Sequence, residues 1–417
     1  MNDKEQKRVE VLNLVISSKI KRKQAAEVLG LSVRHTKRIV AAYRREGVAA
    51  LAHGNRGRKP SHALSPQVRE KVSELARTKY KGFNFSHFTE SLAEREGIRL
   101  SRSSVRRILL EKGVSSPRKR KAPRHRSRRA RFPQEGMLLQ IDGSPHDWLE
   151  GRGPKLCLIG AIDDATSKVP YALFQEQETT QGYMRMLQEI VLRYGIPLAL
   201  YHDKHSIFEV APHNLPSIEE QLAGKQPRTQ FERLMEELGI TSIAANSPPA
   251  KGRIERLWST FQDRLVSELR LAGARTLEEA NRVLHHYLPH FNRQFGVKAN
   301  QPGLAYRQVR AGFRAEEYFC YKYSRIVGAD NGVHFNNQRL QILSSAERAS
   351  YAHCKVEVQQ RLSGSLAIYY EGKRLPTQPA PLKARKLRET VTTVSLSGRT
   401  YTKPAPDHPW RGKFRHF

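Results

Sequence analysis

Apolar residues recur at a helical period in two groups within the first 116 residues. In the first group, residues 21–45, Gly30 suits a left-handed turn between two amphipathic helices, and Ser32 can cap the second of them. The apolar positions expected to face inward are Ala25, Val28 and Leu29 on the first helix and Val33, Ile39 and Val40 on the second. This spacing predicts a helix-turn-helix.

The second group repeats the pattern with a longer turn. Helices are expected over residues 66–79 and 86–96, and Gly97 ends the latter. Ser101 can cap a further helix over residues 102–112. Its apolar stripe consists of Val105, Ile108 and Leu109, and its outward side chains include Arg102, Arg106 and Arg107. A second helix-turn-helix unit over residues 63–116 follows from this pattern.

The pattern changes to strands after residue 136. Apolar runs predict strands over residues 137–144, 169–174, 198–203 and 240–245, and residues 155–168 are expected to form a strand that runs into an Asp-rich turn. Helices are expected over residues 180–194 and 229–238, and a proline-started helix follows the last strand. Three strands, a crossover helix and a parallel strand are the α/β order of a ribonuclease-H-like domain.

Short strands and turns follow from Tyr318 onward. Asp330-Asn331-Gly332 is a hairpin signal, and Glu371-Gly372 predicts another turn. Five short strands predict a small β-barrel over residues 313–377. The last residues, 378–417, are rich in proline and basic side chains and are expected to form a loose arm.

Charge is distributed unevenly along these segments. The 417 residues hold 73 Lys and Arg against 40 Asp and Glu, a formal net charge of +33. Residues 1–135 hold 35 basic and 12 acidic side chains, residues 136–315 hold 21 and 20, and residues 316–417 hold 17 and 8. A generally basic soluble protein would not be expected to segregate its charge in this way. The basic head and tail therefore favour nucleic-acid binding around a nearly neutral middle.

The head offers several candidate DNA contacts. Residues 1–52 would read base edges through the outward side chains of their second helix, which are Arg34, His35, Lys37 and Arg38. A basic helical hairpin that merely packs is the alternative. The linker, residues 53–62, could lie in a minor groove through Arg56, Arg58 and Lys59, or be solvated. The basic arm, residues 117–132, would contact phosphates through Arg118, Lys119, Arg120 and their neighbours, or act as a localisation signal.

Two other classes of protein are disfavoured. No run of about 18 apolar residues is present, so we expect no membrane-spanning segment. The three cysteines are widely spaced and form no CxxC pair, which makes a disulfide framework or a zinc knuckle improbable. A reducing, cytoplasmic location is the corresponding expectation.

Three acids of the middle segment carry a family resemblance. Asp142 ends the first predicted strand, Asp203 ends the fourth, and Glu255 lies on the helix that follows. Together with the motif SPPAKGRIERLW, they resemble the catalytic triad of the DDE transposase and retroviral-integrase superfamily. The phrases LYHDKHSIF and HGNRGR most resemble the ISNCY insertion-sequence family, and the resemblance covers residues 1 to about 375. The 52-residue spacing from Asp203 to Glu255 is read as containing an insertion after Asp203.

The resemblance implies a chemistry and a cofactor. Three carboxylates can hold two Mg²⁺ ions, or Mn²⁺, and such a metal pair suits phosphodiester cleavage. Asp142 would contact both ions, Asp203 one and Glu255 the other. Lys251 is expected to hold DNA beside them, and Arg253 either does the same or simply solvates its helix. Asp163 and Asp164, in a turn, and His202, at a strand end, are interpreted as structural.

The expected protein is therefore a DNA transposase with helix-turn-helix domains, an integrase-like core over residues 133–312 and a small β domain. By resemblance it would bind terminal inverted repeats and target DNA as a homo-oligomer on paired ends. The alternative is a DNA-binding regulator derived from a transposase, with a silent core.

Overall fold

A computed structural model describes residues 3–52, 63–117, 122, 129–210, 228–245, 251–345 and 348–380. Several predicted DNA contacts lie outside the described residues: Arg56, Arg58, Lys59, Arg118, Lys119 and Arg120. The chain divides into two units. One comprises Met1–Arg129, Asp147–Lys155 and Trp258–Val283, and the other comprises Ala130–His146, Leu156–Leu257 and Leu284–Phe417.

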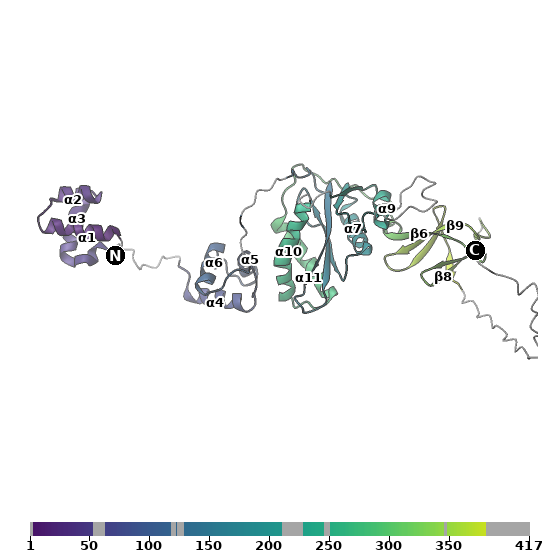
Figure 1. Ribbon diagram of the computed structural model, residues 1–417, viewed down its shortest axis with the longest axis horizontal. Helices are drawn as coiled ribbons and strands as arrows, with labels where there is room; N and C mark the ends of the chain where they lie inside the picture. Colours follow the sequence, from purple (N-terminus) through teal and green to yellow (C-terminus); the bar gives the residue numbers. More distant parts are fainter. Residues whose placement is uncertain are drawn as a thin grey trace, which may run out of the picture. The chain divides into compact units, whose positions relative to one another are not determined.

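The first head domain is a three-helix unit (Figure 1). Its helices are α1 (Asp3–Ile16), α2 (Arg22–Leu29) and α3 (Val33–Glu46), and a 3-10 turn, Gly47–Leu51, follows. The predicted turn is confirmed, because Gly30 adopts φ +63° and the Ser32 hydroxyl accepts a hydrogen bond from His35 N. Its buried core consists of Val11, Leu12, Val15, Ala25, Val40 and Leu51.

Two details of that domain differ from the prediction. Helix α1, which supplies half of the core, was not predicted. Val28 and Val33 were expected to face inward, but both are exposed. On α3 the buried side chains are those of Thr36 and Val40, which lie one turn apart. Val33 is the first residue of the helix and precedes them.

The second head domain follows its prediction to within two residues. Its helices are α4 (Pro66–Arg77), α5 (Phe85–Arg95) and α6 (Arg102–Glu111). Ser101 caps α6 by accepting a hydrogen bond from Ser104 N, as expected, and Asn84 caps α5. Val72, Tyr80, Phe88, Leu92, Val105 and Ile108 form its core.

The core domain contains one five-stranded sheet in the order β3-β2-β1-β4-β5. Its strands are β1 (Leu138–His146), β2 (Leu156–Asp163), β3 (Ala172–Gln175), β4 (Ala199–His202) and β5 (Thr241–Ala244). The first three strands are antiparallel, and β4 and β5 run parallel to β1. The predicted succession of three strands, a crossover helix and a parallel strand is therefore confirmed. One bound is corrected, because β1 continues for four residues beyond Asp142.

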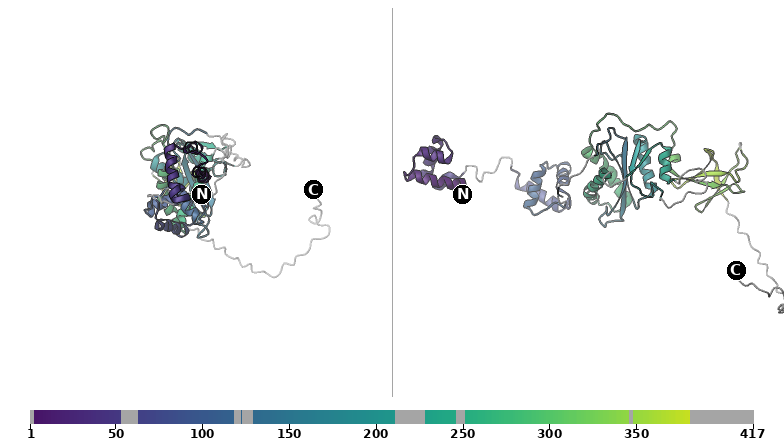
Figure 2. Two further views of the ribbon diagram at one scale, coloured as in Figure 1. Left: turned by 90° about the vertical axis from the view of Figure 1, so that its left-hand side faces the viewer. Right: turned by 45° about the horizontal axis from the view of Figure 1, so that its top comes forward.

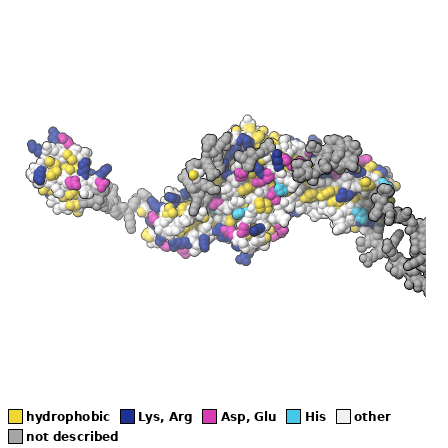
Figure 3. All heavy atoms as spheres, viewed as in Figure 1, with side chains coloured by type: hydrophobic (Ala, Val, Ile, Leu, Met, Phe, Trp, Pro, Cys, Tyr) yellow, Lys and Arg dark blue, Asp and Glu magenta, His cyan; other side chains and the backbone are white. Residues whose placement is uncertain are grey.

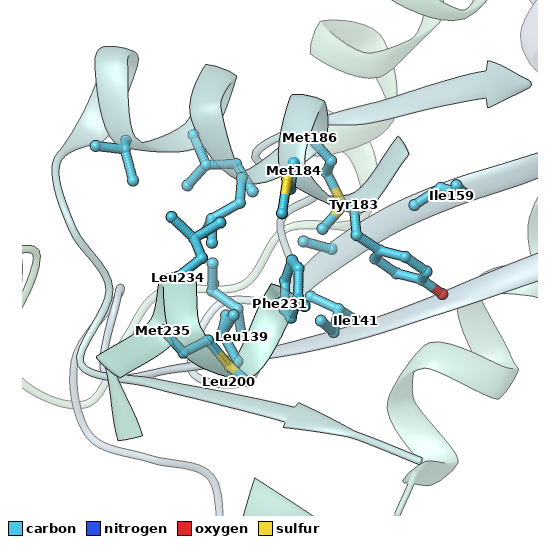
Figure 4. Close-up of a cluster of buried hydrophobic side chains, with 14 of the residues drawn as sticks. Leu139, Ile141, Ile159, Tyr183, Met184, Met186, Leu200, Phe231, Leu234 and Met235 are labelled. Atoms are coloured by element: carbon cyan, nitrogen blue, oxygen red, sulfur yellow. The ribbon is translucent and has the colours of Figure 1, made fainter. Parts of the chain in front are cut away.

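Helices cover both faces of this sheet (Figures 1 and 2). On one face, α7 (Thr180–Tyr194) and α9 (Gln230–Glu237) pack against Leu139, Ile141 and Leu200. Figure 4 shows Tyr183, Met184 and Met186 of α7 meeting Phe231, Leu234 and Met235 of α9 in this cluster.

The opposite face of the sheet meets the start of α10 (Gly252–Leu271) and the end of α11 (Leu277–Phe295). Ile254 N donates a hydrogen bond to Gln140 Oε1 on β1, and Val169 N donates to Asn292 Oδ1. Because side chains alternate between the faces of a strand, Gln140 and Asp142 share the α10 face.

The C-terminal β domain follows α12 (Ala315–Tyr318) and forms two sheets. Four strands are ordered β11-β10-β9-β6, and three are ordered β12-β8-β7. The strands are β6 (Cys320–Ile326), β7 (Gly332–Phe335), β8 (Gln338–Ile342), β9 (Lys355–Arg361), β10 (Leu366–Tyr370), β11 (Lys373–Leu375) and β12 (Thr377–Pro379). Side chains of both sheets share one buried cluster, including Val333, Val358 and Ile368. Since the strands remain in two sheets, the predicted closed barrel is not confirmed.

Of the two turns predicted in this domain, one joins its two strands as expected and the other does not. The turn at Glu371-Gly372 joins β10 to β11 as expected. The hairpin predicted through Asp330-Asn331-Gly332 is wrong, because β6 pairs with β9 and β7 pairs with β8. None of the helices among the described residues is long and apolar enough to cross a membrane.

Candidate functional site

The sheet brings two of the three predicted acids to neighbouring strands. The parallel register of β1 and β4 pairs Leu138 with Ala199 and Gln140 with Tyr201. Continued by two residues, the same register sets Asp142 level with Asp203. Asp142 lies within β1, and Asp203 is the first residue after β4. The strand order therefore explains why two acids 61 residues apart meet.

Both carboxylates contact one ammonium group. Lys251 Nζ lies 2.7 Å from Asp142 Oδ1 and 3.3 Å from Asp203 Oδ2. The Lys251 side chain is only 10% exposed, whereas those of Asp142 and Asp203 are 20% and 45% exposed. A buried ammonium is stable only where charge and hydrogen bonds compensate its desolvation, and the two carboxylates do so here.

The third predicted acid, Glu255, lies in the first turn of α10 and is exposed. Within the described part of the chain, no three His, Cys, Asp or Glu side chains are grouped closely enough to hold a metal ion. The structure thus joins Asp142 and Asp203 through Lys251, and Glu255 remains a predicted member of the site.

The backbone at Asp203 is held by the residue before it. His202 is fully buried, and its Nδ1 lies 2.6 Å from the Asp203 carbonyl oxygen. Because a carbonyl can only accept, Nδ1 carries the proton and donates. Nε2 lies 2.7 Å from Ser242 Oγ, and the ring stacks on Phe208. Burial lowers the pKa of His202, which favours the neutral ring. His202, interpreted as an ordinary strand-end residue, therefore contacts the candidate site's backbone.

A buried polar network lies beside β1 and includes a predicted DNA contact. Arg253 Nε lies 2.7 Å from Asp164 Oδ1, and Gln140 Nε2 donates to the same oxygen at 3.0 Å. Asp164 is fully buried, and Phe132 N donates to its other oxygen. The structural interpretation of Asp164 agrees with these contacts. The DNA contact predicted for Arg253 remains a prediction, since its Nε is already bonded to Asp164.

The second turn acid, Asp163, is also buried. Its carboxylate accepts hydrogen bonds from Gly136 N and from the backbone and hydroxyl of Thr166. Burial raises the pKa of Asp163 although these hydrogen bonds oppose the shift.

A carboxylate that was not predicted from the sequence, that of Glu178, packs against the strand residue after Asp142. Tyr183 Oη donates a hydrogen bond to Glu178 Oε1 at 2.5 Å, and Tyr183 is fully buried. The Glu178 carboxylate lies against Gly143, where a Cβ atom would come within 2.6 Å of its carboxyl carbon. A glycine directly after Asp142 was the available signal, because glycine within a strand often marks a close approach.

The predicted base-reading side chains of the head are accessible. Arg34, His35, Lys37 and Arg38 on α3 are all exposed, as are Arg102 and Arg106 on α6. Figure 3 shows Lys and Arg side chains distributed over the surface of the first head domain. Their exposure agrees with a contact role, and the contact itself remains a prediction.

Solved structures offer only distant similarity. The simian T-cell lymphotropic virus intasome, in complex with PP2A regulatory subunit B56 gamma, covers 75% of this chain and 100% of that chain at 14% identity, with a TM-score of 0.30. The HTLV-2 integrase catalytic core domain, in complex with magnesium, covers 40% of this chain and 93% of that chain at 18% identity, with a TM-score of 0.26. Scores this low carry no weight for the fold or the chemistry of this chain.

Family models and sequence relatives are more informative. A helix-turn-helix domain model matches residues 7–60, and a homeodomain-like domain model matches residues 36–109. The chain is 32% identical to a protein of Sinorhizobium fredii (strain NBRC 101917 / NGR234) named as a transposase, y4bF, over 97% of this chain and 89% of that protein. It is 36% identical to the transposase for insertion sequence IS1202 of Streptococcus pneumoniae, over 70% of this chain and 69% of the relative. Identity of this extent to both relatives shows that the chain belongs to the insertion-sequence transposases.

Proposed function

We propose that this chain is a DDE transposase that binds the terminal inverted repeats of its element and catalyses metal-dependent strand cleavage and strand transfer. One observation carries the proposal: Asp142 and Asp203, from adjacent strands of the core sheet, converge on a single cation. The relatives named as transposases and the two helix-turn-helix domains support it.

The donor set suits a hard divalent cation such as Mg²⁺ or Mn²⁺. Carboxylate oxygens are preferred ligands, and Mg²⁺ is commonly held by one or two carboxylates while water and substrate phosphate fill its other positions. Asp142 and Asp203 would supply those carboxylates, and Glu255, from the start of α10, would complete the set for a second ion. When bound, such ions activate the attacking oxygen and neutralise charge on the leaving 3′ oxygen.

The chain's own residues would position the DNA. The head helices would hold the element end through Arg34, His35, Lys37, Arg38, Arg102 and Arg106. The linker would lie in a minor groove, and the basic arm would contact phosphates. Lys251 would lie beside the scissile phosphate. Assembly of several copies on paired ends belongs to the same proposal, as does the use of target DNA by the same site.

Conservative removal of each acid tests the proposal. Asp142→Asn, Asp203→Asn and Glu255→Gln preserve volume but remove a negative charge, so cleavage of a labelled terminal repeat should fall by orders of magnitude while end binding survives. Asp147→Asn and Glu209→Gln are matched controls that should cleave normally. A variant of the three acids that cleaves at the wild-type rate in Mg²⁺ would show that its residue is wrongly assigned.

A further inference from the structure

We propose that Lys251 is a resident cation of the acidic site, which holds Asp142 and Asp203 together before a divalent metal binds and leaves that position when the metal binds. The inference rests on the proposed function, because it concerns how the same two carboxylates are loaded. It gives Lys251 a role before DNA is engaged, in addition to the DNA contact predicted from its sequence position.

The geometry of Lys251 is that of a bridging cation. Its Nζ contacts one oxygen of each aspartate, at 2.7 and 3.3 Å, and the residue as a whole is buried. Two carboxylates that share a site repel each other when both are ionised, and an ammonium between them removes that repulsion. Lys251 therefore offsets the repulsion between the two aspartates when no metal ion lies between them.

The same geometry creates a competition. A divalent cation bound by Asp142 and Asp203 would use the carboxylate oxygens that now face the ammonium. The two cations cannot share that position, because like charges at such short range repel each other. The Lys251 side chain is long and flexible, so its ammonium can move away while its backbone stays at the start of α10.

The position that the ammonium then takes links metal binding to DNA. A lysine at the edge of the acidic site has an anionic phosphate as its natural partner when nucleic acid is bound. Arg253, two residues later, differs because Asp164, a fully buried side chain, already holds its Nε. Lys251 is therefore the basic residue here that can exchange a carboxylate partner for a phosphate.

Metal binding to the full-length protein without DNA tests the inference. Lys251→Met keeps the aliphatic stem and removes the charge, so the Mn²⁺ dissociation constant, measured by titration calorimetry, should fall on the order of tenfold, as expected when a charge-assisted contact no longer competes. Lys168→Met is the matched control, because Lys168 forms an ion pair of equal length with Glu135. It should bind Mn²⁺ like the wild type.

A second measurement covers the case in which Lys251→Met folds poorly. Lys251→Gln also removes the charge but keeps a polar end, and it should show the same tighter Mn²⁺ binding. In EDTA both variants should melt below the wild type, and saturating Mn²⁺ should remove most of that difference. Equal or weaker Mn²⁺ binding in both variants would overturn the inference.

The outcome can be separated from a failure of the proposed function. Asp142→Asn and Asp203→Asn should abolish Mn²⁺ binding at this site. If they leave it unchanged, the aspartates are not metal ligands, and the proposed function fails together with the inference. If they abolish binding but the Lys251 variants bind like the wild type, the inference alone fails.

Discussion

His202 shows how a single side chain can set the position of a candidate catalytic residue. Its two ring nitrogens serve different partners: Nδ1 donates to the Asp203 carbonyl and Nε2 faces Ser242. The first contact fixes the peptide that carries the Asp203 carboxylate, whereas the second ties the ring to β5. We therefore assign His202 as a positioning residue for Asp203.

Amide substitutions at His202 separate these two contacts. Asn places a donor near the position of Nδ1, and Gln reaches toward that of Nε2. We expect His202→Asn to retain end cleavage within a few-fold of the wild type and His202→Gln to lose about a hundredfold, since small displacements of catalytic groups cost that much. Cleavage rates at saturating Mg²⁺ measure this. Better cleavage by the Gln variant than by the Asn variant would contradict the assignment.

The resemblance to the DDE superfamily, together with the strand-end positions of the two acids, predicted that Asp142 and Asp203 belong to one site, and the parallel pairing of β1 with β4 brings them level. Neither the resemblance nor the strand pattern predicted the ion pair of Arg253 with Asp164 or the packing of Glu178 against Gly143. These contacts depend on how α10 and α7 pack against the sheet. Arg253 and Asp164 lie 89 residues apart and carry no local signature of their contact, and Gly143 marks a close approach without identifying its partner.

At the scale of elements, local sequence signals predicted the helices of the head better than the strand pairing of the C-terminal β domain. Ser32 and Ser101 cap the helices that they were expected to cap. Asn331 adopts φ +54°, as its turn signal indicates, yet the strands on either side find other partners. A turn signal predicts only a local bend in the chain. The pairing of β6 with β9 is a long-range contact that depends on which side chains pack in the buried cluster of the β domain.

Helix α3, which is predicted to read base edges, allows a test that distinguishes base contacts from phosphate contacts. If Arg34 reads a guanine, Arg34→Ala should cost about 1–3 kcal/mol of binding to the element's end and relax the preference at one base pair. Binding titrations on specific and scrambled duplexes measure this. An equal loss on both duplexes would assign Arg34 to the backbone instead.

The second head domain is joined to the later turns of α10 by polar contacts. Glu268 on α10 pairs with both His87 Nε2 and Arg95 on α5, each at 2.7 Å, and Asn84 Nδ2 donates to Asp263 at 2.6 Å. Arg264 adds an ion pair with Glu90. A fragment that contains the head alone would lose these partners.

Acidification should therefore loosen this junction. Burial would raise the pKa of Glu268, but hydrogen bonds from His87 and Arg95 outweigh it and hold the pKa below its usual value of 4.5. A depressed carboxyl pKa stabilises the fold above pH 4.5, and that contribution is lost as the pH falls through the folded value. The protection factors of the α5 amides, which correct for the intrinsic pH dependence of amide exchange, should fall in the wild type as the pH drops below 4.5.

Glu268→Gln supplies the control for this pH dependence. Its α5 amides should exchange faster than those of the wild type at pH 7, with a smaller further change on acidification. Wild-type protection factors that stay constant as the pH falls below 4.5 would contradict the role of this ion pair.

At the scale of the whole molecule, basic charge is concentrated in the segment proposed to bind the element's end and not in the segment proposed to cleave DNA. Residues 1–135 carry a surplus of basic side chains, while residues 136–315 are nearly balanced. Polyanion binding is thereby concentrated outside the segment that contains Asp142, Asp203 and Glu255. Such a division suits a protein that must hold DNA firmly and still bind cations at an acidic site.

Strand transfer into plasmid DNA tests the central claim most directly. The full-length protein is incubated with labelled terminal-repeat DNA, a supercoiled plasmid and Mg²⁺, and joining is measured as label that migrates with the plasmid. A transposase should join the labelled end to the plasmid, and Asp142→Asn should bind the end without joining it. If the wild type binds the end but neither cleaves nor joins it, the protein is a DNA-binding regulator with a silent core. If it cleaves without joining, it is a nuclease. Either result would contradict the account.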